Sequence, residues 1–369
     1  MKQRVSRQTL VKEIYMKIAV GLSGGVDSST AAAILKKQGH SVIGLTMKVW
    51  DISYQGTGVK SACFGPDEKD DIKDAQKIAE LLDIPYHVLD LSQEYKANIL
   101  SYFKAEYLAG RTPNPCVKCN KLIKFGALLD KARNSGIDFN YFATGHYARV
   151  EKQEDRYLLK TAKYDLKDQS YFLVFLSQEQ LAQVIFPLGG YQKAEVRNIA
   201  AEFNLPTHDK KESQDFYSGD YTELLDSLPP QGDIVNKKGI VLGKHKGICH
   251  YTIGQRKGLG ISSASPLYVI SIDRAQNQII VGEETELYHN SLIASSLNWI
   301  SVKKVETPIQ IKAKIRYRQE AEPAQIIPLK NDLVRVEFAR PQKAITPGQV
   351  IAFYQEENVL GGGIIQEAH

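Results

Sequence analysis

The first half of the chain alternates between short apolar runs and segments in which apolar residues recur at helical spacing. Short apolar runs predict buried strands, and a recurrence every three or four residues predicts amphipathic helices. The predicted strands are residues 17–22, 41–50, 85–91 and 139–143, and the predicted helices are residues 27–37, 67–82, 93–107 and 121–132. We therefore expect an α/β fold with a doubly wound, mostly parallel sheet that binds ligands at the carboxyl ends of its strands.

The pattern changes after residue 147. A β-hairpin is predicted over 149–162, followed by helices over 169–184 and 193–204. Further on, short alternating segments separated by Gly and Pro predict strands at 239–242, 268–272, 278–281, 309–317, 333–338 and 350–354. The predicted domains are an N-terminal extension (1–16), the α/β domain (17–210), a small β-rich central domain (211–290) and a C-terminal β-barrel (291–369).

Composition narrows the class of protein. The chain has 369 residues, of which 43% are hydrophobic and 24% charged, as in soluble globular proteins. No apolar run approaches the ~20 residues of a membrane span, and no signal peptide is evident, so we expect a cytoplasmic protein without membrane contact. The four cysteines (Cys63, Cys116, Cys119 and Cys249) are too few for a disulfide framework.

The net charge of +5 is concentrated near the C-terminus. Residues 301–350 contain ten basic side chains against five acidic ones. The basic residues are Lys303, Lys304, Lys312, Lys314, Arg316, Arg318, Lys330, Arg335, Arg340 and Lys343. Two interpretations stay open at this point: an ordinary solvated basic face, or a surface that binds nucleic acid.

A glycine-rich segment follows the first predicted strand and leads into the first predicted helix. It reads Gly21, Leu22, Ser23, Gly24, Gly25, Val26, Asp27, Ser28. Glycines let backbone N–H groups approach phosphate oxygens, and the helix N-terminus adds partial positive charge. The alternative is a turn that only caps the helix through Asp27 or Ser28. The segment lacks the Walker lysine and resembles the PP-loop of enzymes that split ATP into AMP and pyrophosphate. We therefore predict binding of ATP with Mg²⁺.

A second informative segment contains Cys116 and Cys119 just before the helix predicted at 121–132. Two prolines, Pro113 and Pro115, stiffen the loop. We expect the helix N-terminus and the lysines at 118 and 121 to lower the pKa of these thiols and make them reactive. A structural zinc half-site is the alternative, although no second Cys/His pair with suitable spacing follows. Cys63 and Cys249 are interpreted as isolated packing cysteines.

Four further motifs accompany these two segments in the sequence. They are Gly145-His146-Tyr147, residues 167–171, residues 251–260 and residues 315–318. Together with the glycine-rich segment and the Cys-x-x-Cys segment, they resemble the tRNA-specific 2-thiouridylase family, from about Lys17 to Gly363. The resemblance implies ATP-dependent thiolation of the wobble uridine of tRNA at C2, with sulfur supplied by a donor protein or by sulfide.

The resemblance also implies roles for individual residues. The ATP-binding residues would be Gly21, Leu22, Ser23, Gly24, Gly25, Val26, Asp27, Ser28, Met47 and Gly145. The tRNA-binding residues would be Asn114, Pro115, Cys116, His146, Lys167, Asp168, Gln169, Arg316, Tyr317 and Gln349. Cys119 matches the family's nucleophile, whereas Cys116 stands where some members have an aspartate.

One departure from the family concerns sulfur handling. The family's second cysteine usually follows a Glu-Ser-Gln-Asp stretch, but residues 212–215 are here followed by Phe216 and Tyr217. Tyrosine cannot carry sulfane sulfur. Three alternatives follow: Cys116 and Cys119 form the sulfur-carrying pair, or they ligate an iron–sulfur cluster with a third ligand from elsewhere, or thiolation has been lost. A PP-loop ligase with another substrate, or a relative that only binds tRNA, would be the rival functions.

Overall fold

The computed structural model describes residues 15–50, 63–207, 216, 217 and 219–369. Most of the predicted N-terminal extension, the predicted boundary at 210/211 and the Glu-Ser-Gln-Asp stretch lie outside the described residues.

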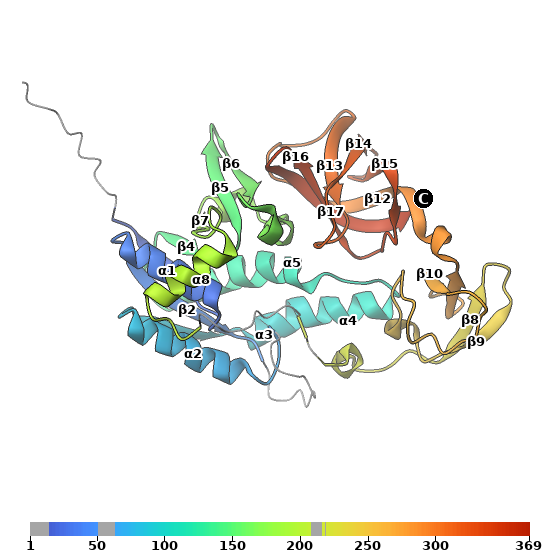
Figure 1. The fold of residues 1–369 in the computed structure, drawn as a ribbon, viewed down its shortest axis with the longest axis horizontal. Coiled ribbons are helices and arrows are strands. Elements are labelled where there is room, and N and C mark those ends of the chain that lie inside the picture. Colours follow the sequence, from blue (N-terminus) through green and yellow to red (C-terminus); the bar gives the residue numbers. More distant parts are fainter. Residues whose placement is uncertain (1–14, 51–62, 208–215, 218) are drawn as a thin grey trace, which may run out of the picture.

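A parallel five-stranded sheet forms the first layer of the molecule (Figure 1). Its strands, in spatial order, are β3 (Tyr86–Asp90), β2 (Ser41–Lys48), β1 (Lys17–Gly21), β4 (Tyr141–Ala143) and β7 (Val184–Ile185). The flanking helices are α1 (Val26–Lys37), α2 (Glu68–Leu81) and α8 (Lys193–Glu202). Helix α1 packs closely because Ala31, Ala32 and Ala33 are fully buried. The predicted parallel α/β fold is confirmed, and the carboxyl end of β1 leads into the glycine-rich segment.

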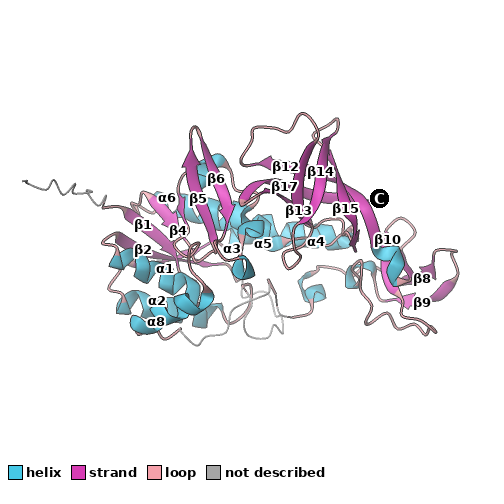
Figure 2. Cartoon of the chain, turned by 45° about the horizontal axis from the view of Figure 1, so that its top comes forward, coloured by secondary structure: helices cyan, strands magenta, loops and turns pink. Residues whose placement is uncertain are grey.

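Two long helical segments leave this sheet and extend beneath the barrel (Figures 1 and 2). The first comprises α3 (Ser92–Tyr95), the π-helical η1 (Lys96–Leu100) and α4 (Ser101–Leu108). The second comprises α5 (Pro115–Cys119), the π-helical η2 (Asn120–Ala127) and α6 (Leu128–Asn134). The second segment begins six residues earlier than predicted, because Pro115 is favourable in the first helical turn and Asn114 caps it. Cys116 and Cys119 therefore lie in the helix and not in the loop before it.

The C-terminal strands form a closed barrel, as predicted. Its strands are β12 (Tyr288–Trp299), β13 (Ile309–Lys314), β14 (Glu322–Pro328), β15 (Val334–Lys343), β16 (Val350–Gln355) and β17 (Asn358–Ala368). Pairing of β12 with both β15 and β17 closes the barrel. The predicted hairpin, β5 (Ala148–Gln153) and β6 (Arg156–Thr161), adds to the barrel sheet where Lys160 pairs with Asn358. This pairing joins the first half of the chain to the last.

A smaller four-stranded sheet lies between these parts in the sequence. Its strands are β8 (Gly232–Asn236), β9 (Val241–His245), β10 (Tyr268–Asp273) and β11 (Gln278–Gly282). Three short 3₁₀ helices accompany it, η5 (Tyr221–Leu224), η6 (Ile248–His250) and η7 (Glu284–Leu287). A turn joins β10 and β11, with Asn277 at φ 50°.

The helix predicted over 169–184 is wrong. The segment instead contains the 3₁₀ helix η4 (Ser170–Leu173), the short helix α7 (Gln178–Leu181) and strand β7. The Asp168 carboxylate accepts from the backbone N–H of Ser170, and Ser177 starts a new helix through a capping box with Gln180. Side chains that bond to nearby backbone groups compete with a continuous helix. In the described part of the chain, no helix is long and apolar enough to cross a membrane.

We expect Asp168→Ala to lower the free energy of unfolding by about 2 kcal/mol, because it leaves buried donors without a partner. Asp168 is 5% exposed and accepts from the Ala162 N–H at 3.0 Å and the Ser170 hydroxyl at 2.8 Å. The measurement is urea denaturation. Asp165→Ala, an exposed position of the preceding 3₁₀ helix η3 (Asp165–Lys167), is the matched control and should change stability by less than about 0.5 kcal/mol.

Candidate functional site

The glycine-rich segment forms a backbone cradle between β1 and α1. Gly25 is the N-cap of α1, and Gly24 has a φ of +68° that favours glycine. The Ser28 hydroxyl accepts from the Ser23 N–H at 3.1 Å, and the Ser29 hydroxyl donates to the Gly25 carbonyl at 2.7 Å. These contacts hold the segment open at the N-terminus of a twelve-residue helix, which suits binding of phosphate groups.

Gly145 packs directly against the backbone of this cradle. A Cβ at position 145 would lie 2.7 Å from the Ser28 nitrogen and 2.7 Å from the Asp27 carbonyl carbon. Gly145 follows β4, whose neighbour in the sheet is β1, so the cradle and Gly145 meet at the carboxyl ends of adjacent strands. Met47, at the same end of β2, is partly buried against the main core. The structure therefore brings the three predicted parts of the ATP site to one sheet edge.

The Asp27 carboxylate is the centre of a polar group beside the cradle. The Lys193 ammonium contacts its two oxygens at 2.7 and 2.8 Å, and the Tyr147 hydroxyl donates to it at 2.7 Å. Lys193 is the first residue of α8, far from the cradle in sequence. Lys193 was not among the predicted site residues, because nothing in its local sequence indicates this contact.

His146 connects the phosphate cradle to the cysteine helix. Its Nδ1 lies 2.7 Å from the Thr144 hydroxyl, and its ring lies 5.9 Å from that of Phe125. Burial, together with the nearby Lys124 ammonium, lowers the pKa of His146 to about 3. The imidazole is therefore neutral at physiological pH and can act as a hydrogen-bonding group but not as a cation.

The helix that carries the cysteines is anchored at its first turn. The Asn114 side chain accepts from the Val117 N–H at 3.3 Å, and the Asn114 N–H faces the Tyr102 hydroxyl at 3.4 Å. Cys116 is partly buried, Cys119 is 7% exposed, and neither forms a disulfide. The cap fixes the residue at which the helix that carries both cysteines begins.

The prediction that the pKa of the cysteine thiols is lowered is wrong for Cys119. Burial raises the pKa of Cys119 to about 11, and the Lys124 charge offsets only part of that rise. Lys118 and Lys121, which we expected to lower the pKa of the thiols, instead lie over aromatic rings. The Lys118 ammonium lies 3.9 Å from the centre of the Tyr102 ring, and the Lys121 ammonium 5.8 Å from that of Phe175. Lys124, one helical turn beyond Cys119, is the cation that acts on the thiol.

One of the barrel residues predicted to contact tRNA, Gln349, holds the barrel against the loop before the cysteine helix. The Gln349 amide donates to the carbonyls of Thr112 and Pro113, both at 3.0 Å. Arg316 donates to the Ala344 carbonyl at 2.7 Å and to the Thr346 hydroxyl at 2.9 Å, inside the barrel end. The Tyr317 ring packs 4.4 Å from that of Phe172. The structure thus brings Gln349 next to the residues that precede Asn114 and Pro115.

Residues 167–169 lie at the edge of the same region. Asp168 is buried and bonded internally, and Gln169 accepts from the Tyr147 N–H at 3.0 Å. Lys167 is partly exposed, and its neighbour Leu166 is 98% exposed. Of the three, Asp168 is the buried residue, and Asp168 and Gln169 position the segment through their hydrogen bonds.

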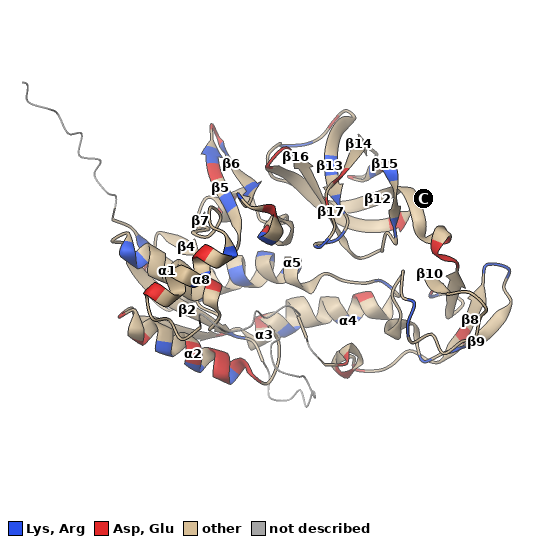
Figure 3. Ribbon diagram, viewed as in Figure 1, with Lys and Arg blue, Asp and Glu red and all other residues tan. Residues whose placement is uncertain are grey.

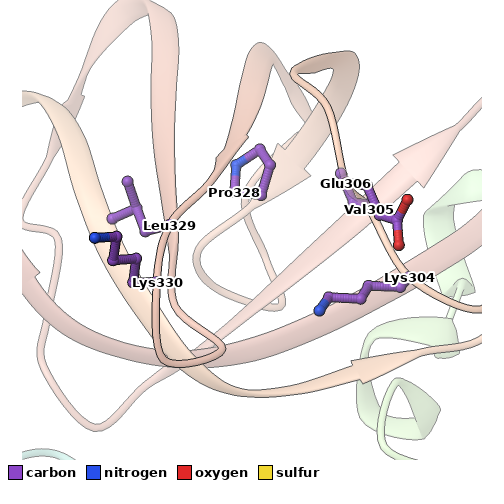
Figure 4. Close-up of a pocket in the computed structure, with 6 residues that line it drawn as sticks. All are labelled: Lys304, Val305, Glu306, Pro328, Leu329 and Lys330. Carbon is purple, nitrogen blue, oxygen red and sulfur yellow. The ribbon is translucent and has the colours of Figure 1, made fainter.

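Several elements near this region carry basic residues. Lys and Arg lie on the β5–β6 hairpin, on α5, and on barrel strands β13 and β15 (Figure 3). They favour a polyanionic ligand through long-range attraction. A hollow of about 460 Å³ lies elsewhere, on the barrel, and is lined by residues including Lys304, Glu306 and Lys330 (Figure 4). No residue of the cradle or of the cysteine helix lines it. We locate the site at the cradle because backbone donors at a strand end bind phosphate without a preformed deep cavity.

Three family models match the chain in sequence order. A model described as tRNA methyl transferase HUP domain matches residues 16–217. A model described as tRNA methyl transferase PRC-barrel domain matches residues 223–283, and one described as aminomethyltransferase beta-barrel domain matches residues 289–365. The parallel sheet, the cradle and the cysteine helix all lie in the first match. Fold and site therefore define a PP-loop protein that uses ATP and carries a C-terminal barrel.

Curated relatives resemble the chain over nearly its whole length. The tRNA-specific 2-thiouridylase MnmA of Endomicrobium trichonymphae is 48% identical over 359 residues, covering 96% of this chain and 99% of the relative. A Thermoanaerobacter tRNA-specific 2-thiouridylase is 48% identical over 367 residues with the same coverage. One from Clostridium botulinum is 43% identical over 358 residues, covering 95% of this chain and 99% of the relative. The chain belongs to the tRNA-specific 2-thiouridylase family.

Similarity to solved structures is weak. NMN synthetase from Francisella tularensis has a TM-score of 0.33 and 18% identity, over 57% of this chain and 68% of that one. A 4-thiouridine synthetase, in a complex with RNA and bound ATP, has a TM-score of 0.36 and 15% identity, over 57% of this chain and 46% of that one. The family assignment therefore rests on the sequence relatives.

We expect Gly145→Ala to weaken ATP binding by at least about tenfold, because the added methyl group would displace the backbone at Asp27 and Ser28. Isothermal titration calorimetry with ATP measures the effect. Gly190→Ala is the matched control, since no atom lies within 4 Å of a Cβ built there. Equal affinity of the two variants would contradict the placement of the cradle.

The lowered pKa of His146 predicts a dependence of stability on pH. The unfolded imidazole has its ordinary pKa of about 6.5, whereas the folded group protonates only near pH 3. The unfolded state therefore binds the proton first, and the contribution to stability is complete above pH 6.5 and is lost as the pH falls toward 3. Between pH 7 and 5, the free energy of unfolding should fall by about 2 kcal/mol more in the wild type than in His146→Asn. Urea titrations at the two pH values measure this difference.

Proposed function

We propose that this protein thiolates C2 of the wobble uridine of tRNA at the expense of ATP. The observation that carries the proposal is a continuous series of neighbours from the phosphate cradle to a thiol. Gly145 packs on Ser28, and His146 follows Gly145. The His146 ring lies 5.9 Å from that of Phe125, and Phe125 and Cys119 belong to one buried cluster. An adenylated base bound at the cradle would thus face a cysteine.

The chemistry follows from these neighbours. The uridine C2 oxygen attacks the α-phosphorus of ATP, and pyrophosphate leaves. A persulfide carried beside the cysteine helix then attacks C2 through its terminal sulfur, and AMP leaves with the former uridine oxygen. A second protein thiol attacks the carrier sulfur, so that the transferred sulfur stays on C2 and the protein is left with a disulfide. The cradle N–H groups stabilise charge that develops on the phosphates. Lys124 stabilises the thiolate form of Cys119, which burial alone disfavours.

The tRNA is proposed to lie between the barrel and the cysteine helix. Asn114, Pro115 and Cys116 would line the pocket of the target base, with His146 beside them. Lys167 and the basic side chains of the hairpin and barrel would contact the phosphate backbone. Gln349, Arg316 and Tyr317 would shape this region, because they hold the barrel end against residues 112–113 or pack beside it. Asp168 and Gln169 would support Lys167.

The other components of the reaction are also proposals. Mg²⁺ would enter with the triphosphate, and Asp27 is a carboxylate of the cradle that could help hold it. An iron–sulfur cluster does not fit: among the described residues, no group of three or more His, Cys, Asp or Glu could hold a metal. Sulfur would come from a persulfide-bearing donor protein or from sulfide, and the reaction would take place in the cytoplasm, where tRNA and ATP are present.

We expect Cys119→Ala to lower the rate of 2-thiouridine formation by more than about a hundredfold while tRNA-dependent release of pyrophosphate continues. Adenylation needs the cradle and not the thiol, whereas sulfur transfer needs the thiol. Liquid chromatography with mass spectrometry of digested tRNA measures 2-thiouridine. Cys249→Ala is the control, because Cys249 is equally buried but lies beside the central sheet, in η6.

Two results would count against the proposal. Full thiolation by both Cys116→Ala and Cys119→Ala would exclude sulfur transfer at this helix. Tight binding of tRNA without any 2-thiouridine in cells that depend on this gene would indicate a relative that only binds tRNA.

A further inference from the structure

The cysteine that the family uses as its second thiol is absent after residue 215, and the structure shows what lies beside that position. The Phe64 N–H donates to the Phe216 carbonyl at 3.0 Å. Residue 63 is therefore held next to the segment in which the family's second cysteine usually occurs. Residue 63 is itself a cysteine, and its side chain is exposed.

An aromatic cluster fixes this arrangement. The fully buried Phe64 ring stacks on Tyr95 at 5.2 Å and 12°, and on Phe216 at 6.1 Å and 7°. Phe103 packs on Phe216 at 5.0 Å. Because the residue next to Cys63 is anchored in this cluster, the backbone position of Cys63 is defined.

The same cluster lies against the cysteine helix. Burial opposes the positive charge of Lys124, but the thiolates of Cys119, Cys63 and Cys116 would all raise its pKa. The pKa of Tyr95, which stacks on Phe64, is also raised. Burial is the main cause, and the charges of the same three thiolates add to it. Cys119 belongs to the same buried cluster as Phe64 and Tyr95, and Cys116 packs against that cluster. Cys63 therefore adjoins the cluster that holds the other two thiols, although it is more than 50 residues away from them in sequence.

We propose that Cys63 is the sulfur-carrying cysteine of this protein, in place of the one that is missing after residue 215, and that Cys119 is its resolving partner. This inference rests on the proposed thiolation. The exposure of the two thiols fits the two roles. A persulfide-bearing donor can reach the exposed Cys63, whereas the buried Cys119 is protected from side reactions until the base is bound.

Sulfur passes from the donor to the uridine by way of Cys63. Cys63 takes a sulfane sulfur from a donor persulfide, which leaves as a thiol. The terminal sulfur of the Cys63 persulfide anion attacks C2 of the adenylated uridine, and the C2–O bond to AMP breaks. The Cys119 thiolate then attacks the Sγ of Cys63, and the bond between that Sγ and the transferred sulfur breaks. Its electron pair stays on the sulfur, which gives 2-thiouridine. The protein is left with a Cys63–Cys119 disulfide, and an external dithiol reductant returns both thiols.

The test is a single turnover with full-length protein, tRNA, ATP and glutathione persulfide as the sulfur source, without added reductant. We expect Cys63→Ser to form 2-thiouridine at least about a hundredfold more slowly than the wild type. Pyrophosphate release should stay within about threefold of the wild type, because Cys63 is exposed and is not part of the cradle. Peptide mapping of the wild type under non-reducing conditions should show a Cys63–Cys119 disulfide. Cys249→Ala is the control for loss of a cysteine elsewhere.

Several outcomes would overturn the inference while the proposed function stands. They are full-rate thiolation by Cys63→Ser, a Cys116–Cys119 disulfide after turnover, or loss of pyrophosphate release together with thiolation, which would make Cys63 a structural residue. A wild type that forms no 2-thiouridine would instead overturn the proposed function itself.

Discussion

The arrangement of the molecule depends on the contact between the barrel and residues 111–114. The Thr112 N–H donates to the Pro347 carbonyl at 3.0 Å, and the Gln349 amide returns two hydrogen bonds to the loop. A Cβ at Gly348 would lie 2.9 Å from the Thr112 carbonyl oxygen, so the two backbones are in close contact. Since Asn114 caps the cysteine helix directly after this loop, the barrel sets the position at which that helix begins. Residues more than 230 apart in the sequence are thereby joined at the site.

Electrostatics at the site are governed by burial as much as by charge. His146 is kept neutral, and the Cys119 thiol is made less acidic, because both lie where water is largely excluded. Lys124 is the cation shared by both groups. A single ammonium therefore disfavours the imidazolium and favours the thiolate. The result is a neutral hydrogen-bonding group beside the phosphate cradle and a thiol whose raised pKa is only partly offset by Lys124.

The sequence predictions succeeded where periodicity is regular, and they failed where side chains redirect the backbone or where distant segments meet. The parallel sheet, the hairpin at residues 148–161 and the closed barrel were predictable because periodicity and turn residues are local signals. The helix predicted over 169–184 failed because Asp168 and Ser177 redirect the backbone through their side chains. The long strands β12 and β17 were missed because their mixed polar and apolar pattern acquires meaning only when the barrel closes.

The sequence by itself determined the phosphate cradle, the Cys-x-x-Cys segment and the family resemblance, since each depends on residues that are adjacent along the chain. Only the tertiary structure decided which groups act on them. Lys193 reaches Asp27 from another helix, Lys124 and not Lys118 or Lys121 faces Cys119, and Cys63 is brought beside Phe216 by stacked rings. Charge and burial act through space, and the distances through space are set by packing between segments whose separation along the chain carries no local signal.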